Sequence, residues 1–119
     1  KKDYLRVGGE NISSMQVEAT INEHPKIMES AVFGVRTEGG EDALMLDVTL
    51  KPGEKLMPEE VMDWCQERLP RFAMPRYIRF FTEELPRTPS GKVQKFKLRE
   101  QAITPDTWDR VKAGYKLKR

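Results

Sequence analysis

Hydrophobic and polar residues alternate most clearly over residues 43–51, where the apolar positions are Leu44, Leu46, Val48 and Leu50 and the positions between them are Met45, Asp47, Thr49 and Lys51. A period of two residues is that of a β-strand with one buried face. Residues 30–35 and 77–81 are shorter apolar runs of the same kind, and residues 3–7 form a further candidate strand. The Gly-rich turn 38–42 joins two of these runs, which predicts an antiparallel pair with one face buried.

Helical patterns occupy the segments between the candidate strands. Ser13 and Gln16 form a capping box, which predicts a helix that begins there and ends before Pro25. Pro58 stands where a second helix would begin. Residues 59–69 place their apolar side chains on one stripe of that helix.

Two shorter helices are expected after the last strand, over residues 96–103 and from Pro105 onward. We predict an α+β fold in which a small antiparallel sheet, of about three main strands plus a short N-terminal hairpin, is flanked by helices. The 119 residues suffice for one domain. The chain opens in strand-like sequence without a methionine, and we therefore expect residues 1–119 to be a piece of a longer protein.

Composition and single residues exclude several classes of function. The net charge of +2 gives no general attraction to nucleic acid, and no apolar run approaches membrane-spanning length. The single cysteine, Cys65, cannot form a disulfide within the chain and fits a reducing cytoplasm, where we expect the protein to be located. Its place on an apolar stripe predicts a core residue. His24 is expected to contact the last carbonyls of the first helix, and no metal site is predicted.

The segment 85–93 carries the first candidate for chemistry. Two prolines and a Ser-Gly turn precede Lys92, which predicts a stiff, exposed loop that presents one ammonium. The run from the opening of the loop to Glu100 contains only basic charges, namely Arg87, Lys92, Lys95, Lys97 and Arg99. A P-loop would need glycine at Pro86 and Ser or Thr at Val93, so this lysine suits a phosphate that is bound elsewhere. The alternative is an ordinary surface turn.

The second candidate is Gly8-Gly9-Glu10-Asn11, which lies between the first strand and the capping box. Its glycines can take positive φ and leave backbone N–H groups open to a ligand. Spacing alone favours a plain hairpin turn.

Three motifs in order give the whole chain a resemblance to the C-terminal domain of the adenylate-forming superfamily, which includes acyl-CoA synthetases, luciferases and peptide-synthetase adenylation domains. The first motif, Lys1-Lys2-Asp3, resembles the end of the family's hinge. The second, Gly8-Gly9-Glu10-Asn11-Ile12-Ser13 with Glu18 downstream, resembles the glycine loop of CoA ligases. The third, Pro86-x-x-x-x-Gly91-Lys92-Val93 with Lys95 and Leu98-Arg99, resembles the motif of the catalytic lysine. One departure is Gln16, where the family usually has glutamate.

The resemblance implies a two-step ligase. A carboxylate attacks the α-phosphate of ATP, which carries Mg²⁺, and the thiol of CoA then displaces AMP from the acyl-adenylate. Lys92 is implied to be the catalytic cation of the first step. The loop of Gly8, Gly9, Glu10 and Asn11 is implied to lie along CoA in the second. Lys2 and Asp3 are implied to form the hinge on which this domain rotates against a large N-terminal domain.

The expected partners follow from this reading. They are the N-terminal domain, a carboxylic acid, and a lysine acetyltransferase and deacetylase that act on Lys92, because acetylation would remove its charge. ATP and the acid would bind mainly to the absent domain, so we expect the isolated chain to be inactive.

Four alternatives remain open from sequence. Two belong to the same superfamily, a peptide-synthetase adenylation domain that passes its acyl group to a carrier protein and a luciferase-like oxidase. The third is a free-standing binding module without chemistry of its own. The fourth is a nucleic-acid patch over residues 87–99, which Phe96 alone supplies with an aromatic side chain.

Overall fold

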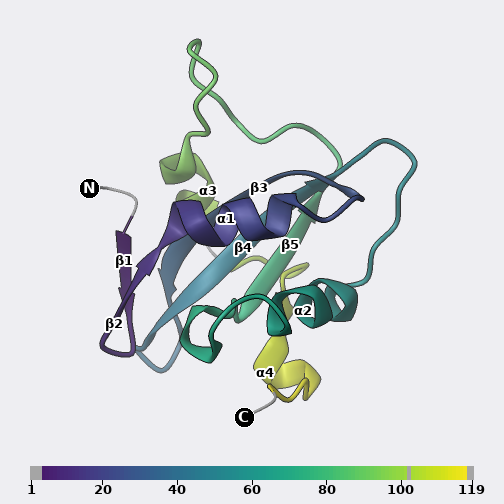
Figure 1. Cartoon of the computed structure of the whole chain (residues 1–119). Coiled ribbons are helices and arrows are strands. Elements are labelled where there is room, and N and C mark those ends of the chain that lie inside the picture. The colour runs from purple at the N-terminus through teal and green to yellow at the C-terminus, as the bar shows by residue number, and fades with distance from the viewer. Residues whose placement is uncertain (1–3, 102, 118–119) are drawn as a thin grey trace.

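The computed structural model describes residues 4–101 and 103–117 and contains two sheets (Figure 1). In chain order the elements are β1 (Tyr4–Val7), β2 (Glu10–Ser13), α1 (Ser14–Asn22), β3 (Ile27–Arg36), β4 (Asp42–Leu50), α2 (Pro58–Gln66), a 3₁₀ turn (Arg71–Ala73), β5 (Tyr77–Phe81), α3 (Lys95–Gln101), β6 (Trp108–Asp109) and α4 (Arg110–Ala113). β1 and β2 form a hairpin, and the main sheet has the order β3-β4-β5-β6. The predicted α+β class is confirmed.

The main sheet is mixed, whereas the sequence predicted an antiparallel one. β3 and β4 pair antiparallel as expected, but β4 and β5 run parallel, with Leu46 opposite Ile78. The connection over residues 51–76 contains α2 and is long enough to return the chain to the end of the sheet where β4 began. Such a crossover makes the parallel pairing possible.

The C-terminal segment corrects a second prediction. Residues from Pro105 were expected to form a helix, but Trp108 pairs antiparallel with Ile78 as part of β6. The helix α4 begins after this strand, where the carboxylate of Asp109 accepts a hydrogen bond from the backbone N–H of Val111 (2.9 Å). β6 contributes only two residues to the sheet, too few for a recognisable period.

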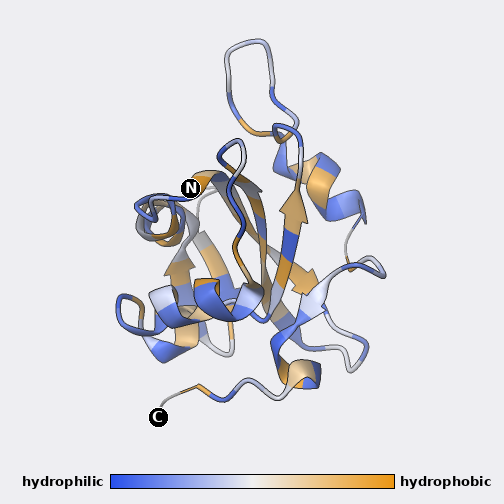
Figure 2. Ribbon diagram, turned by 90° about the vertical axis from the view of Figure 1, so that its right-hand side faces the viewer, coloured by the Kyte–Doolittle hydropathy of each residue, from blue (hydrophilic) through white to orange (hydrophobic). Residues whose placement is uncertain are grey.

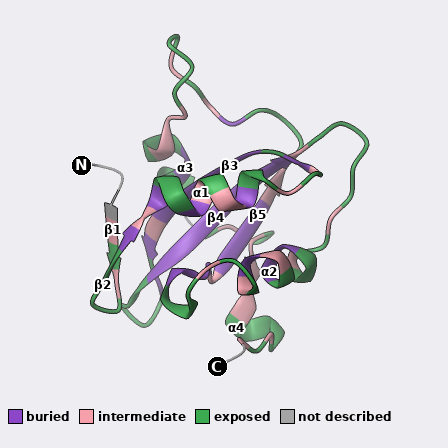
Figure 3. Ribbon diagram, in the orientation of Figure 1, coloured by how far each residue is buried: buried purple, intermediate pink, exposed green. Residues whose placement is uncertain are grey.

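Both faces of the sheet are buried, although one buried face was predicted (Figure 3). On the face covered by α1 and α2 the central buried side chains are Val17, Ile21, Val32, Leu46, Val48, Val61, Met62, Cys65 and Ile78. On the other face they are Ala31, Phe33, Val35, Ala43, Met45, Tyr77, Leu85 and Leu98. Figure 2 shows hydrophobic positions concentrated on the strands, with helices on both sides. The second cluster therefore holds the chain that follows β5, including α3, against the sheet.

A buried ion pair lies on this second face. Asp47 and Arg79 are opposite each other in the parallel register, and their side chains are 0% and 2% exposed. The guanidinium donates to both carboxylate oxygens, at 2.9 and 2.6 Å. Burial raises the pKa of Asp47, and the hydrogen bonds and charge of Arg79 oppose that rise. The alternation of residues 43–51 had placed Asp47 on an exposed face, and this prediction was wrong.

The single cysteine and the single histidine both pack against other parts of the domain. Cys65 is fully buried, as predicted for a core residue, and burial raises the pKa of its thiol to about 12. The backbone N–H of His24 donates to the carbonyl of Ile21 at the end of α1 (3.0 Å), so His24 contacts the last turn through its backbone and not through its imidazole. Its Nδ1 instead accepts a hydrogen bond from the backbone N–H of Lys26 (3.1 Å), and its ring packs edge-on against Trp64, with centroids 4.7 Å apart. The pKa of His24 is lowered, chiefly by burial of its ring.

Removing either partner of the Asp47–Arg79 pair should lower the free energy of unfolding by about 3–5 kcal/mol, because the remaining charge is buried without its counterion. The two variants should differ in their pH dependence. In Arg79→Met, Asp47 loses the group that lowers its pKa, so the folded chain holds a proton that the unfolded chain releases. The pKa of Asp47 already lies above the ordinary 3.8 in the native fold, and it lies higher still without Arg79, so the deficit of this variant relative to the native sequence should grow as pH rises through the raised pKa of the native Asp47.

The deficit of Asp47→Asn should not grow over the same range, because the guanidinium left behind cannot lose its proton. Urea unfolding at about pH 5 and about pH 7 measures both deficits. A deficit of Arg79→Met that stays constant between these pH values would contradict the account.

Candidate functional site

Residues 86–94 form a narrow hairpin, here called the lysine hairpin, that projects from the body of the domain at the top of Figure 1. Arg87 and Val93 form an antiparallel bridge at its base. The backbone N–H of Thr88 donates to the carbonyl of Lys92 (2.8 Å), and that of Gly91 donates to the carbonyl of Thr88 (2.9 Å). Gly91 has φ +94°, a left-handed conformation that L side chains rarely adopt, so the chain reverses directly before Lys92.

The backbone of Lys92 is held from both sides, whereas its side chain is exposed. The hydroxyl of Thr88 accepts a hydrogen bond from the N–H of Lys92 (3.1 Å) and shares another with the hydroxyl of Ser90 (2.9 Å). Within the described residues, no carboxylate lies within ion-pair distance of the Lys92 ammonium. The sequence predicted a stiff, exposed loop that presents one ammonium, and the structure confirms that Lys92 is exposed on this loop.

The chain that leaves the hairpin is attached to α1. Lys95 forms an ion pair with Glu18 (Nζ to Oε2, 2.6 Å) and donates to the hydroxyl of Ser14 (3.3 Å). The same carboxylate oxygen of Glu18 accepts a hydrogen bond from the backbone N–H of Val32 (2.8 Å). Glu18, which the motif comparison singled out, therefore joins α1, β3 and the start of α3.

A groove of about 670 Å³ runs beside the lysine hairpin. Its walls combine the cations Lys92, Lys95 and Arg99, the exposed apolar side chains Met15 and Phe96, and the acid Glu18. Lys95 is already paired with Glu18, so Lys92 and Arg99 supply the available positive charge. The arrangement suits an anion with an adjoining apolar or planar part.

Gly8 and Gly9 form the two-residue turn of the β1–β2 hairpin, with φ of +58° and +83°. Positive φ at both central positions is the requirement of the tightest hairpin turns, so the plain turn favoured by spacing is confirmed. A Cβ added at either glycine would meet no atom within 4 Å. Asn11 is not free, because its side-chain oxygen accepts a hydrogen bond from Arg6 (2.8 Å).

The two candidate loops lie at separate ends of the domain. The Gly8–Gly9 turn is at the lower left of Figure 1, and the lysine hairpin is at the top. The fold therefore does not bring Lys92 together with Gly8, Gly9, Glu10 and Asn11 in one site. The third predicted element, the hinge of Lys2 and Asp3, lies outside the described residues.

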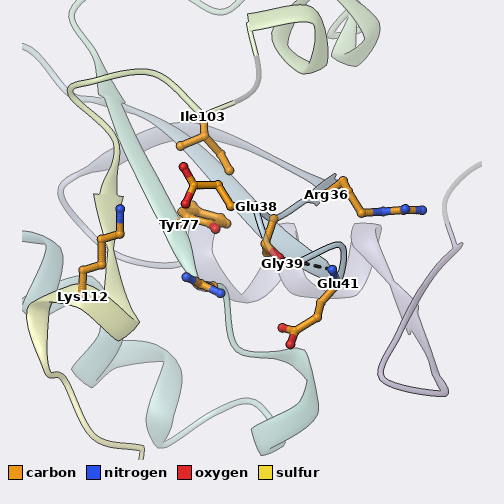
Figure 4. Close-up of a pocket in the computed structure, with 9 residues that line it drawn as sticks. Arg36, Glu38, Gly39, Glu41, Tyr77, Ile103 and Lys112 are labelled. Atoms are coloured by element: carbon orange, nitrogen blue, oxygen red, sulfur yellow. Dashed lines mark hydrogen bonds between the residues drawn. The ribbon is translucent and has the colours of Figure 1, made fainter.

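Sequence reasoning did not single out a second cavity, of about 470 Å³, beside the β3–β4 turn (Figure 4). Acidic and basic side chains are mixed around it, and the carboxylate of Glu38 lies beside Tyr77, on the side that carries Lys112. Its arginines are already paired, Arg36 with Asp42 (3.1 Å) and Arg76 with Asp109 (3.0 Å). The cavity is therefore a poor match for a phosphate.

Within residues 4–101 and 103–117, no three His, Cys, Asp or Glu side chains are grouped so that they could hold a metal ion. None of the helices in this part of the chain has the length and apolar character that crossing a bilayer requires.

Comparison with known proteins decides the family. Residues 16–92 match the family model described as the AMP-binding enzyme C-terminal domain. The chain belongs to this family. This AMP-binding enzyme C-terminal domain is 42% identical to 2-methylpropanoate–CoA ligase CCL4 of Humulus lupulus over 103 residues. The matched region covers 85% of this chain and 18% of that ligase. The chain is 41% identical over 100 residues to the mitochondrial medium-chain acyl-CoA ligase ACSF2 of Rattus norvegicus, which covers 84% of this chain and 16% of that protein.

Solved structures agree with the family assignment. The anthranilate CoA ligase AuaEII, in complex with anthranoyl-AMP, superimposes with a TM-score of 0.78 at 36% identity, over 85% of this chain and 20% of that one. The AMP-binding enzyme C-terminal domain described here thus spans less than a fifth of the length of these two curated relatives.

Two buried carboxylates near the candidate site were missed by sequence reasoning. Glu29 contacts the base of the lysine hairpin, and Asp47 holds Arg79 beneath α3. For Asp47 the only signal was a charged residue within the predicted strand 43–51, and this signal does not name its distant partner. Glu29 precedes the predicted strand 30–35, so the pattern gave no signal for it.

Replacing Thr88 by valine should loosen the lysine hairpin without unfolding the domain. The hydroxyl of Thr88 accepts the N–H of Lys92, and one hydrogen bond is worth about 0.5–1.5 kcal/mol, so exchange of this amide should become roughly 2- to 10-fold faster. Amide hydrogen exchange read at Lys92 measures the effect. Ser90→Ala is the control, because it removes only the bond between the two hydroxyls. Unchanged exchange in Thr88→Val would show that the hydroxyl does not hold the loop.

Proposed function

We propose that this chain is the C-terminal domain of an ATP-dependent acyl-CoA ligase, which converts a carboxylic acid, ATP and CoA into acyl-CoA, AMP and pyrophosphate. The observation that carries the proposal is the exposed ammonium of Lys92, on a backbone fixed by Thr88, in a chain of this family. Relatives named as acyl-CoA ligases support a thioester product over transfer to a carrier protein or oxidation.

Lys92 acts in the first half-reaction. As the carboxylate attacks the α-phosphate, negative charge spreads over the phosphoryl oxygens and the entering oxygen. An ammonium at the end of a projecting hairpin can enter a site formed by another domain, and no carboxylate among the described residues neutralises it first. As a compact point charge it can bridge phosphate and carboxylate oxygens.

The Gly8–Gly9 turn acts in the second half-reaction. Both positions lack a side chain and face open space, so a narrow thiol-bearing arm can pass close to the backbone. Because this turn and the lysine hairpin lie at separate ends of the domain, both can reach one active site only in succession. Rotation about a hinge at Lys2 and Asp3 would exchange them, and it would withdraw Lys92 before CoA enters.

ATP, its Mg²⁺ and the acid are assigned mainly to a large N-terminal domain. The described residues offer no cluster of metal ligands, so the metal would be held by the phosphates and by groups of that domain. Substrate choice among carboxylic acids would lie there as well, and the chain by itself should form no thioester. A reducing compartment, the cytoplasm, is proposed on the free, buried thiol of Cys65.

Lys92→Ala in the full-length enzyme should lower the adenylation rate by roughly 10²- to 10³-fold, the usual cost of removing one contact to developing negative charge. Formation of thioester from supplied acyl-adenylate and CoA should be unchanged. Pyrophosphate release measures the first step, and acyl-CoA formation measures the second. Lys97→Ala, an exposed lysine of α3, is the matched control. If adenylation survives in Lys92→Ala, the lysine hairpin is an ordinary surface turn and the proposal fails.

Acetylation of Lys92 should have the same selective effect, because it removes the charge of an exposed ammonium. An enzyme with acetyl-lysine incorporated at position 92 should lose adenylation and keep thioester formation from the adenylate. Treatment with a lysine deacetylase should restore adenylation, and acetyl-lysine at position 97 controls for the modification itself. Equal loss of both half-reactions would argue against regulation through this charge.

A further inference from the structure

Glu29 is a buried acid whose carboxylate faces the entry of the lysine hairpin. It lies at the start of β3, where the register with β4 shifts between Ile27 and Glu29, and it is 8% exposed. Its Oε2 accepts a hydrogen bond from the backbone N–H of Leu85 (2.8 Å), and its Oε1 pairs with the guanidinium of Arg87. These partners are 56 and 58 residues away in sequence, so the contacts fix the relation between two distant segments.

The two contacts hold the last buried residue before the hairpin and a residue of its base. Leu85 is 2% exposed and belongs to the second core cluster. Arg87 forms the bridge with Val93, the residue directly after Lys92. A change in the direction of Arg87 is therefore passed across the bridge to the chain that carries Lys92. Because the hairpin projects from the domain, a small tilt at its base becomes a larger displacement at its tip.

A structural contribution to stability does not account well for this arrangement. The side chain of Glu29 is 10% exposed and that of Arg87 is 35% exposed, so forming the pair costs desolvation that offsets part of the attraction between the charges. Its geometric contribution is large, because one carboxylate holds a backbone N–H and a guanidinium at the same time. The contacts of Glu29 therefore specify the direction in which the lysine hairpin leaves the domain.

We propose that Glu29 is a positioning residue for Lys92, which acts through Arg87 and Leu85 to set the direction of the lysine hairpin during adenylation. This inference rests on the proposed function, since it concerns the half-reaction assigned to Lys92. A misplacement of about 1 Å at a reacting centre can cost roughly 100-fold in rate. Glu29 should matter for the step that uses the hairpin and not for the step that uses the Gly8–Gly9 turn.

The test uses Glu29→Gln in the full-length enzyme. Glutamine keeps an oxygen for the N–H of Leu85 and removes the charge that faces Arg87, so the variant isolates the pair. The adenylation kcat should fall by roughly 10-fold with the KM for ATP unchanged, because the contact that is lost matters in the transition state. Thioester formation from supplied acyl-adenylate should stay within roughly 2-fold, and amide exchange in a peptide covering residues 86–94 should become faster.

A purely structural role predicts a different pattern. Both half-reactions would then fall together, in proportion to the folded fraction, or neither would change. The control is Asp109→Asn, which breaks the partly buried pair with Arg76 at the opposite end of the sheet order. It should leave the ratio of the two half-reaction rates unchanged. A similar change of that ratio in Asp109→Asn would overturn the assignment to Glu29.

A double-mutant cycle tests the route through Arg87. If Glu29 acts through this arginine, Arg87→Met should reproduce the defect, and the double variant should be no slower in adenylation than the slower single variant. Independent, additive losses would contradict the proposal. Arg87→Met also serves if Glu29→Gln does not fold, because this side chain is largely outside the core clusters. If Lys92→Ala leaves adenylation intact, the proposed function fails. If Lys92→Ala lowers the adenylation rate and Glu29→Gln does not, the proposed function stands and only the positioning role of Glu29 is excluded.

Discussion

The burial of a permanent positive charge constrains this domain more than any other single contact. Arg79 cannot become neutral, so its guanidinium must keep its partners wherever the chain folds. These partners are Asp47 on β4, the carbonyl of Leu98 (3.3 Å) and the side chain of Gln101 (3.0 Å) on α3. One side chain thereby ties two parallel strands to the helix that follows the lysine hairpin. The parallel pairing of β4 with β5, the covered second face and the exit of the hairpin all meet at this side chain.

The hairpin is thus attached to the body of the domain by charges at both ends. Glu29 holds its entry, and the Lys95–Glu18 pair, followed by α3 on Arg79, holds its exit. Apolar contact is made by Leu85 and Leu98 on either side of the hairpin and by the partly buried Val93 at its base. Such an attachment gives a long loop a defined direction without requiring its tip to be packed. The proposed chemistry needs the same combination, a cation that is reachable and yet well aimed.

Local signals were sufficient for the parts of the structure that local interactions determine. The cap of α1 is one case, since the hydroxyl of Ser13 accepts the N–H of Gln16 (3.2 Å) within a few residues of sequence. The positive φ of Gly8, Gly9 and Gly91 follows from residue type, and both candidate loops could be located. The parallel pairing of β4 with β5, and the burial of Asp47, could not. Both features require Arg79 to pair with Asp47 across the sheet, and these residues are too far apart in sequence for any local pattern to include them both.

The core of the domain does not include the loop that carries its candidate chemistry. Residues 88–92 contribute to neither hydrophobic cluster, and their hydrogen bonds stay largely within the hairpin. Folding therefore places almost no restriction on which side chain stands at position 92. A variant there would be expressed, purified and melted like the native protein while lacking its ammonium. Damage at this position would escape every measure of structural integrity and would be visible only in turnover.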